Sequence, residues 1–206
     1  MYWSEFLAIA LAHLFAVASP GPDFAIVTRQ SVMAGTRVGI WTSLGVGAGI
    51  LVHVSYCILG VALLLTRYEQ LFNLMKFCAA GYLCFLGLQS LRLSMQEQQV
   101  LDSGSAVTTE ASRAFWSGFL TNGLNPKATL FFLALFTVVI DITTPTIVQI
   151  FYGLYLALAT FIWFAMLSAI LGKQKVRDFM LRAGVWFERG MGIILILLAV
   201  QIVAFA

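Results

Sequence analysis

Long apolar stretches, separated by short polar breaks, follow one another along almost the whole chain. A helix needs about 20 predominantly apolar residues to cross the hydrocarbon core of a bilayer. Backbone polar groups find no water there, so each crossing stretch must be a helix and not a strand. Thr144 followed by Pro145 predicts a helix start, with threonine as N-cap and proline at the first helical position. The pattern predicts an all-α chain of six transmembrane helices, near residues 3–28, 38–65, 71–93, 114–140, 145–172 and 185–205.

One polar stretch, residues 94–112, is much longer than the other breaks and low in hydrophobicity. Such a composition is typical of a flexible linker. It divides the chain into a first three-helix unit at residues 1–93 and a second at residues 113–206. Three is an odd number, so the second unit enters the membrane from the opposite side. Related halves would therefore form a 3+3 inverted repeat, an architecture common among secondary transporters.

Two alignments of the halves are possible. An offset of 106 residues pairs Ser19-Pro20 with Asn125-Pro126. An offset of 104 residues instead pairs Pro22-Asp23 with Pro126-Lys127. The sequence leaves both open.

Composition agrees with a membrane protein. The 206 residues are 61% hydrophobic and 10% charged, whereas a soluble domain carries about 25% charged residues. No basic stripe interleaved with aromatic residues is present, which argues against nucleic-acid binding.

The distribution of positive charge predicts the orientation. Nine of the twelve lysines and arginines lie in or beside the connections 1–2, 3–4 and 5–6, against two on the other side, Arg67 and Lys76. Positive residues concentrate on the cytoplasmic side, so the linker is expected inside the cell and both termini outside. The predicted localisation is multi-pass in the bacterial inner membrane. The remaining cation, Lys127, lies within the fourth apolar stretch.

The first candidate functional motif is Ser19-Pro20-Gly21-Pro22-Asp23, in the first apolar stretch. Two prolines remove backbone donors and clash with the preceding turn, so the helix must break or kink. Freed carbonyls in lipid are tolerated only where they line a cavity or bind something, and an intramembrane carboxylate is a functional hypothesis by default. The alternative is a simple kink with Asp23 reaching the cytoplasmic interface.

The second motif is Asn122-Gly123-Leu124-Asn125-Pro126-Lys127, in the fourth stretch. Lys127 lies about 20 Å of helix beyond Ala114, too deep to reach the interface easily. It requires a counter-ion, for which Asp23 is the acidic candidate within the core. The alternative is a purely structural salt bridge between the two helices.

Together the motifs suit a zwitterion. A broken helix offers N–H groups to a carboxylate, while free carbonyls and Asp23 accept an ammonium group. In an alternating-access cycle, Asp23 would exchange a proton for the substrate ammonium. Lys127, Asn122 and Asn125 would orient the substrate carboxylate.

These motifs, with Gly35-Thr36-Arg37-Val38-Gly39 after the first helix, resemble the LysE/RhtB family of amino-acid exporters. The stretches from Ala12-His13 to Asp23-Phe24 and from Gly118 to Asn122 are most similar to threonine and homoserine exporters. The resemblance implies efflux of small amino acids, driven by the proton gradient, from a protein that is often a homo-oligomer. It implies no cofactor, and it leaves the substrate open between several amino acids.

Two histidines are secondary candidates. His13 shares a face with Pro20, and His53 is in line with Gly45 and Gly49 on the second predicted helix. Either could relay a proton near neutral pH, or simply make a hydrogen bond across a helix contact. The glycines indicate close helix packing.

Other functions fit less well. A membrane-embedded enzyme needs a base beside a nucleophile and an orienting third group. Neither histidine lies near a Gly-x-Ser-x-Gly motif or a cysteine pair, and paired intramembrane aspartates are absent, so no catalytic residue is expected. A metal-ion exporter, the main alternative, needs Cys, His and carboxylate groups at close spacing. Cys57, Cys78 and Cys84 lack such company, so no metal ligand is expected.

Overall fold

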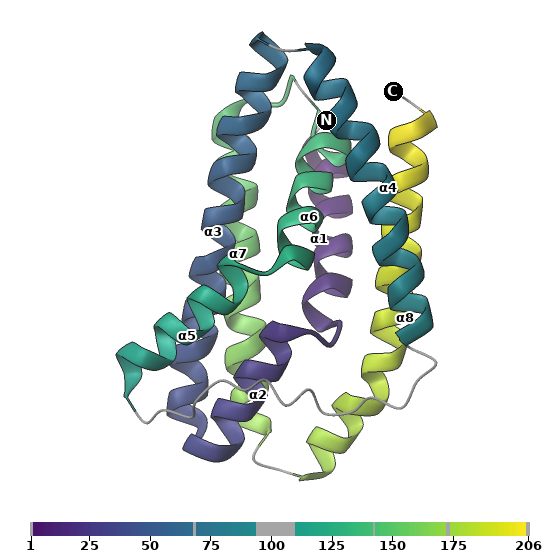
Figure 1. Cartoon of the computed structure of the whole chain (residues 1–206). Coiled ribbons are helices and arrows are strands. Elements are labelled where there is room, and N and C mark those ends of the chain that lie inside the picture. The colour runs from purple at the N-terminus through teal and green to yellow at the C-terminus, as the bar shows by residue number, and fades with distance from the viewer. Residues whose placement is uncertain (1, 68, 94–109, 142, 172–173, 205–206) are drawn as a thin grey trace.

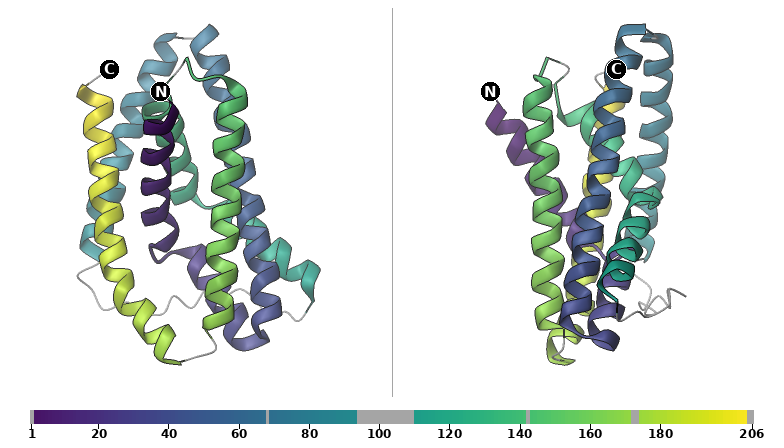
Figure 2. Two further views of the ribbon diagram at one scale, coloured as in Figure 1. Left: turned by 180° about the vertical axis from the view of Figure 1, so that it is seen from behind. Right: turned by 90° about the vertical axis from the view of Figure 1, so that its left-hand side faces the viewer.

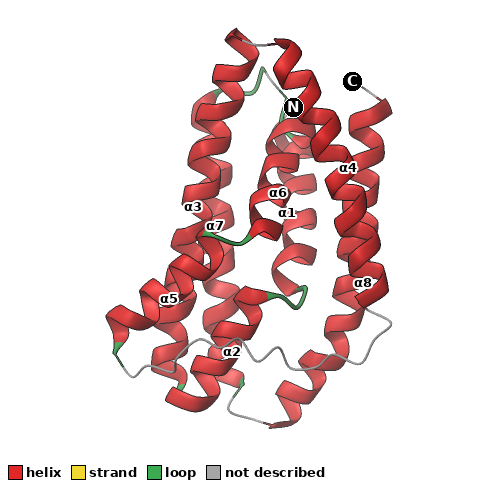
Figure 3. Cartoon of the chain, in the orientation of Figure 1, coloured by secondary structure: helices red, strands yellow, loops and turns green. Residues whose placement is uncertain are grey.

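The computed structural model describes residues 2–67, 69–93, 110–141, 143–171 and 174–204. Every element in these ranges is helical, which confirms the all-α prediction (Figure 3). The elements are α1 (Tyr2–Ala18), α2 (Pro22–Ala34), α3 (Thr36–Arg67), α4 (Glu69–Leu93), α5 (Ala111–Gly123), α6 (Pro126–Ala134), the π-helical turn η1 (Leu135–Val139), α7 (Thr146–Ile170) and α8 (Gln174–Ala204).

The helices form an elongated bundle with both chain ends at the same end of the molecule (Figure 1). α3 packs along α7, and α4 packs along α8. Between these pairs lie α1, α2 and α6, whereas α5 crosses α3 at the edge of the bundle (Figure 2). The breaks between α1 and α2 and between α5 and α6 lie in the middle part of the bundle. A turn at Gly35, whose φ of 92° favours glycine, joins α2 directly to α3.

Within the described ranges, two helical segments are long and apolar enough to cross a membrane, Thr36–Gly60 and Thr146–Ile170. The pair α1 and α2 passes the same test as one span bent by 54°. Large apolar side chains such as Trp3, Leu59 and Ile147 are exposed on the outside of the bundle, where lipid tolerates them.

Glycines bring α3 and α5 into direct backbone contact. A Cβ atom added at Gly45 would collide with the Phe115 carbonyl oxygen, and one at Gly118 would collide with the Thr42 carbonyl oxygen. Gly49 packs against Asn122 in the same contact. The predicted close packing at Gly45 and Gly49 is therefore confirmed.

Hydrogen bonds join the N-terminal end of α1 to α7 and to the loop before it. The Glu5 carboxylate accepts hydrogen bonds from Thr144 Oγ1 at 3.0 Å and from Tyr152 Oη at 3.2 Å. The sequence predicts Thr144 as the cap of the following helix, and this prediction is wrong. The N-cap is Pro145, and the Thr144 hydroxyl is taken by Glu5 instead.

Several predicted boundaries differ from the structure. The first apolar stretch forms two helices that continue to Ala34, and α8 begins at Gln174, eleven residues before the predicted start. Both extensions are polar segments that continue a helix beyond its apolar part. Residues 94–109 of the predicted linker lie outside the described residues, and α5 begins at Ala111.

Candidate functional site

The first break separates α1 from α2. α1 ends at Ala18, and the Ser19 N–H still donates to the Phe15 carbonyl at 3.0 Å. Gly21 is the N-cap of α2, in an extended conformation and without a side-chain cap. Pro22 is the first residue of α2, where its missing N–H costs nothing. Asp23 follows, in the first turn, where the helix dipole favours a negative charge.

The second break separates α5 from α6. α5 ends at Gly123, and Asn125 is the N-cap of α6. The Asn125 side-chain oxygen accepts a hydrogen bond from the Lys127 backbone N–H at 3.0 Å, which satisfies one of the donors at the helix start. Pro126 is the first residue of α6. Both breaks expected from the prolines are therefore present.

The charged residues occupy the same position in the two breaks. Pro22 and Pro126 each open a helix, and Asp23 and Lys127 each follow that proline. The helix starts thus match the offset of 104 residues and not the offset of 106.

Side chains at each break also make hydrogen bonds to residues at the other break. The Lys127 ammonium donates to Ser19 Oγ at 2.9 Å. In return, Asn122 Nδ2 donates to Asp23 Oδ2 at 2.9 Å. The two motifs, about a hundred residues apart in sequence, therefore share one site.

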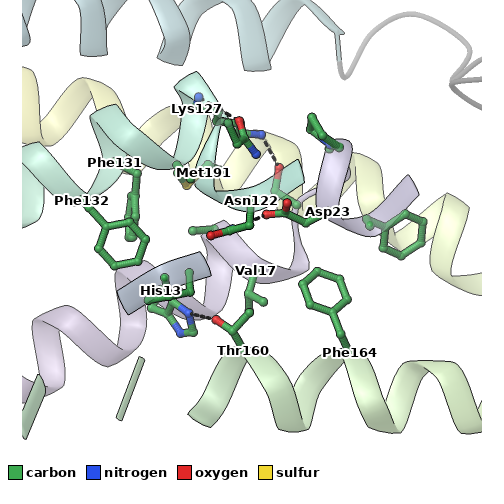
Figure 4. Close-up of a pocket in the computed structure, with 18 residues that line it drawn as sticks. His13, Val17, Asp23, Asn122, Lys127, Phe131, Phe132, Thr160, Phe164 and Met191 are labelled. Atoms are coloured by element: carbon green, nitrogen blue, oxygen red, sulfur yellow. Dashed lines mark hydrogen bonds between the residues drawn. The ribbon is translucent and has the colours of Figure 1, made fainter. Parts of the chain in front are cut away.

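A cavity of about 60 Å³ lies where the breaks meet (Figure 4). This is several times the space that a single water needs by the same measure. One part of the wall is polar and charged, with Asp23, Asn122 and Lys127. The rest is mostly apolar, with Phe131, Phe132, Phe164, Val17, Ile50 and Met191 among its residues.

One oxygen of the acid in this cavity has no partner. Asp23 Oδ1 is buried and makes no hydrogen bond with any of the described residues. Its second oxygen, Oδ2, is held by Asn122. A buried carboxylate oxygen without a donor is costly, so it is suited to receive one from a bound molecule.

Most predicted site residues line this cavity. The lining includes Ser19, Gly21, Pro22, Asp23, Asn122, Asn125 and Lys127, together with the secondary candidate His13. Pro20 and Pro126 shape the breaks and are not among the residues that line it.

His53 lies outside the lining and holds helices together. Its Nε2 is 3.0 Å from the Asn122 carbonyl oxygen, and its Nδ1 is 2.7 Å from Tyr56 Oη. Its ring stacks on Phe132 at a centroid distance of 5.4 Å. This arrangement matches the hydrogen bond across a helix contact, one of the two interpretations left open by the sequence.

Sequence reasoning missed several lining residues. Phe131 lies one turn after Lys127, so its helical spacing from that residue was a usable signal. Thr160 is a polar residue in a long apolar stretch, which was another. Met191 comes from α8 and offered no such signal.

The described residues contain no group of three His, Cys, Asp or Glu side chains placed to hold a metal ion. Cys57 is buried and belongs to no such group among the described residues.

Comparisons with known proteins agree on one family. Residues 14–204 match a family model described as "LysE type translocator". The chain is 27% identical to the threonine efflux protein of Escherichia coli K12, over 89% of each chain. It is 31% identical to the leucine efflux protein of Salmonella typhimurium, over 70% of this chain and 65% of that protein. No solved structure matches the chain.

Proposed function

The chain belongs to the LysE-type translocator family, and from this premise we propose that it is a secondary active exporter of small amino acids in the bacterial inner membrane. Relatives named for threonine and leucine efflux support amino acids as the substrate class. We further propose that the cavity between the two breaks is the substrate site.

The observation that carries this proposal is the meeting of opposite charges on one cavity. Asp23 presents an unmatched carboxylate oxygen, and Lys127 presents an ammonium group bound to Ser19. An amino acid carries the complementary pair, an ammonium and a carboxylate on one carbon. Asp23 would accept from the substrate ammonium, and Lys127 would attract the carboxylate.

The helix ends around the cavity support the same orientation. Lys127 lies in the first turn of α6, where the helix dipole adds positive potential to its charge. Such a helix start is an anion site, so the substrate carboxylate would lie there. α1 ends at the same site, where Ser19 Oγ accepts a hydrogen bond from the Lys127 ammonium. The substrate ammonium would lie at the unmatched carboxylate oxygen of Asp23.

We propose that export is coupled to protons at Asp23. With its Oδ1 buried and unmatched, Asp23 needs either an ammonium group or a proton on that oxygen. Exchange of one for the other would link outward movement of the substrate to inward movement of a proton. The prediction from the sequence that Asp23 has this role thus remains a proposal.

The proposed architecture is six spans in a 3+3 inverted repeat, with both termini outside the cytoplasm. In it, α1–α2, α3 and α4 correspond to α5–α6, α7 and α8. The matching helix starts at Pro22 and Pro126 support this correspondence. We also propose that the protein forms a homo-oligomer and that the lysines and arginines of its cytoplasmic side contact anionic membrane lipid.

The decisive test is the Asp23→Asn variant, which keeps the shape of the side chain and removes its charge. We expect export to fall to the level of cells without the protein, while the amount of protein in the membrane is unchanged. Cells loaded with dipeptides of threonine, homoserine, leucine, lysine and arginine would show which amino acids leave the cell. Full export by Asp23→Asn would refute the coupling role.

Asp141 offers a matched control. It is fully exposed in the loop before α7, outside the spanning segments. Hydrogen bonds from the Thr143 side chain and backbone lower the pKa of its carboxyl, so it is ionised at neutral pH. Asp141→Asn also removes one negative charge, yet we expect it to leave export unchanged, since its side chain lines no part of the cavity.

A further inference from the structure

A hydrogen-bonded pair lies in the cavity wall away from Lys127. His13 Nε2 is 2.8 Å from Thr160 Oγ1, in a bond that joins α1 to α7. Figure 4 shows this pair on one side of the cavity and Lys127 on the other. Both side chains are almost fully buried, with exposed fractions of 4% and 2%.

The surroundings of the pair are apolar. Apart from the groups at the two breaks, His13 and Thr160 are the polar residues in the described lining. Phe131, Phe132 and Phe164 supply much of the remaining wall. An amino acid whose head group lies at Asp23 and Lys127 would therefore direct its side chain toward this part of the cavity.

His13 and Thr160 are hydrogen-bonded to each other, and the pair can still make a further hydrogen bond. A threonine hydroxyl has one donor and two acceptor lone pairs, and the bond to His13 uses only one of these. A hydroxyl on a bound molecule can join the pair. An alkyl group in the same place leaves no polar atom unpaired, so it is tolerated as well.

We propose that the His13–Thr160 pair is the side-chain subsite of the exporter, which accepts compact uncharged side chains and favours a hydroxyl over a methyl group at this position. The proposal rests on the proposed function, because it assigns the other end of the same site. It predicts that threonine is preferred to valine, which differs from it by this one replacement.

Cationic side chains do not fit this subsite. The described lining carries one carboxylate, Asp23, which the substrate's own α-ammonium occupies. A second ammonium or a guanidinium group at His13 and Thr160 would be buried without a counter-ion, at a large energetic cost. Lysine and arginine are therefore excluded as good substrates.

The test is the ratio of threonine to valine export from cells loaded with equal amounts of the two dipeptides. Thr160→Val replaces the hydroxyl by a methyl at nearly constant volume. Since one uncharged hydrogen bond changes an equilibrium about 3- to 10-fold, we expect the ratio to fall by that factor. Valine export should persist, and Thr160→Ser, which keeps the hydroxyl, should keep the ratio.

Thr42→Val is the matched control. Thr42 is equally buried, but its hydroxyl donates to the Val38 carbonyl of its own helix and does not line the cavity. We expect it to leave the ratio unchanged. If Thr160→Val does not accumulate in the membrane, Thr160→Ala removes the same hydroxyl without adding volume, and the same fall is expected.

The outcomes separate this proposal from the proposed function. Equal losses of threonine and valine export in Thr160→Val would show that the pair only joins α1 to α7, and would overturn the subsite. Strong lysine export by the unmodified protein would also overturn it. Export of no amino acid by the unmodified protein would instead refute the proposed function.

Discussion

The two breaks have the same plan but are held in different ways. Each has a proline at the helix start and a charged residue next to it. The first break, Ser19 to Gly21, has no side-chain cap at its helix start. The second is capped by Asn125, and the preceding helix, α5, is locked onto α3 through glycine contacts. We infer that the acid lies on the more adjustable break and the base on the more rigid one.

This difference indicates how two equivalent helix starts could have different roles in transport. A site that binds a zwitterion needs opposite charges at equivalent positions, and Asp23 and Lys127 provide them. Proton exchange at Asp23, as proposed above, would require this group to change its surroundings. Asp23 follows the break that has no side-chain cap. Changing each break separately tests whether the two breaks differ in this way.

After the complete loss expected for Asp23→Asn, the largest effect is expected from removing the positive charge of Lys127. Lys127→Ala takes the positive charge from the cavity and leaves the Ser19 hydroxyl without its donor. We expect the export rate to fall about 100-fold, or roughly 3 kcal/mol, as in the loss of one partner of a buried ionic site. Rates per inserted molecule in dipeptide-loaded cells measure this.

The double variant Asp23→Asn/Lys127→Ala distinguishes two roles of the charges. If the two groups bind separate parts of the substrate, the second change rescues nothing. Partial recovery of export would show a structural ion pair and would contradict the zwitterion site. Arg113→Ala is the control, since Arg113 is exposed and pairs with Glu110 at 3.0 Å on the surface. Such pairs contribute little.

A smaller effect is expected from loosening the rigid side. In Gly45→Ala the new Cβ would meet the Phe115 backbone, which cannot move aside as a flexible side chain can. We expect a loss of about 2 kcal/mol of stability from overpacking, seen as a lower Tm of the protein in detergent.

Gly60→Ala is the control, because nothing lies within 4 Å of its Cβ position. Alanine there should raise helix stability slightly, since glycine is a poor helix former. Equal Tm changes in the two variants would show that the contact of α3 with α5 is not tight.

The smallest effect is expected at the cap of the second break. Asn125→Ala removes the acceptor for the Lys127 N–H, at a cost of about 1 kcal/mol. Asn125→Ser keeps a capping oxygen and should restore most of the Tm. If Asn125→Ala leaves Tm unchanged, the cap does not distinguish the two breaks.

Local patterns predicted much of this arrangement. The apolar stretches indicated the helices, and the prolines located both breaks, because each proline changes the backbone where it stands. The residues of both motifs stand out in the sequence by their type and spacing. That the motifs meet follows from the fold, and the only hint of it in the sequence was the need of Lys127 for a counter-ion.

Features that depend on distant partners could not be predicted. Thr144 has the chemistry of a cap, but Glu5, far away in sequence, takes its hydroxyl. Thr160 stands out as a polar residue in an apolar stretch, but its pairing with His13 depends on the packing of α1 beside α7. The choice between the two alignments also required the observed helix starts.

Two of the hydrogen bonds between α1 and α7 have one more consequence. Glu5 binds Tyr152, and His13 binds Thr160, with the same sequence separation of 147 residues in each case. The two helices thus run in the same direction and are joined at points about 12 Å apart along their axes. A helix fastened twice in one register cannot slide along its neighbour without releasing both bonds together. α1 would then travel with α7 as one piece, and Ser19 to Gly21 would be the pivot on which α2 swings.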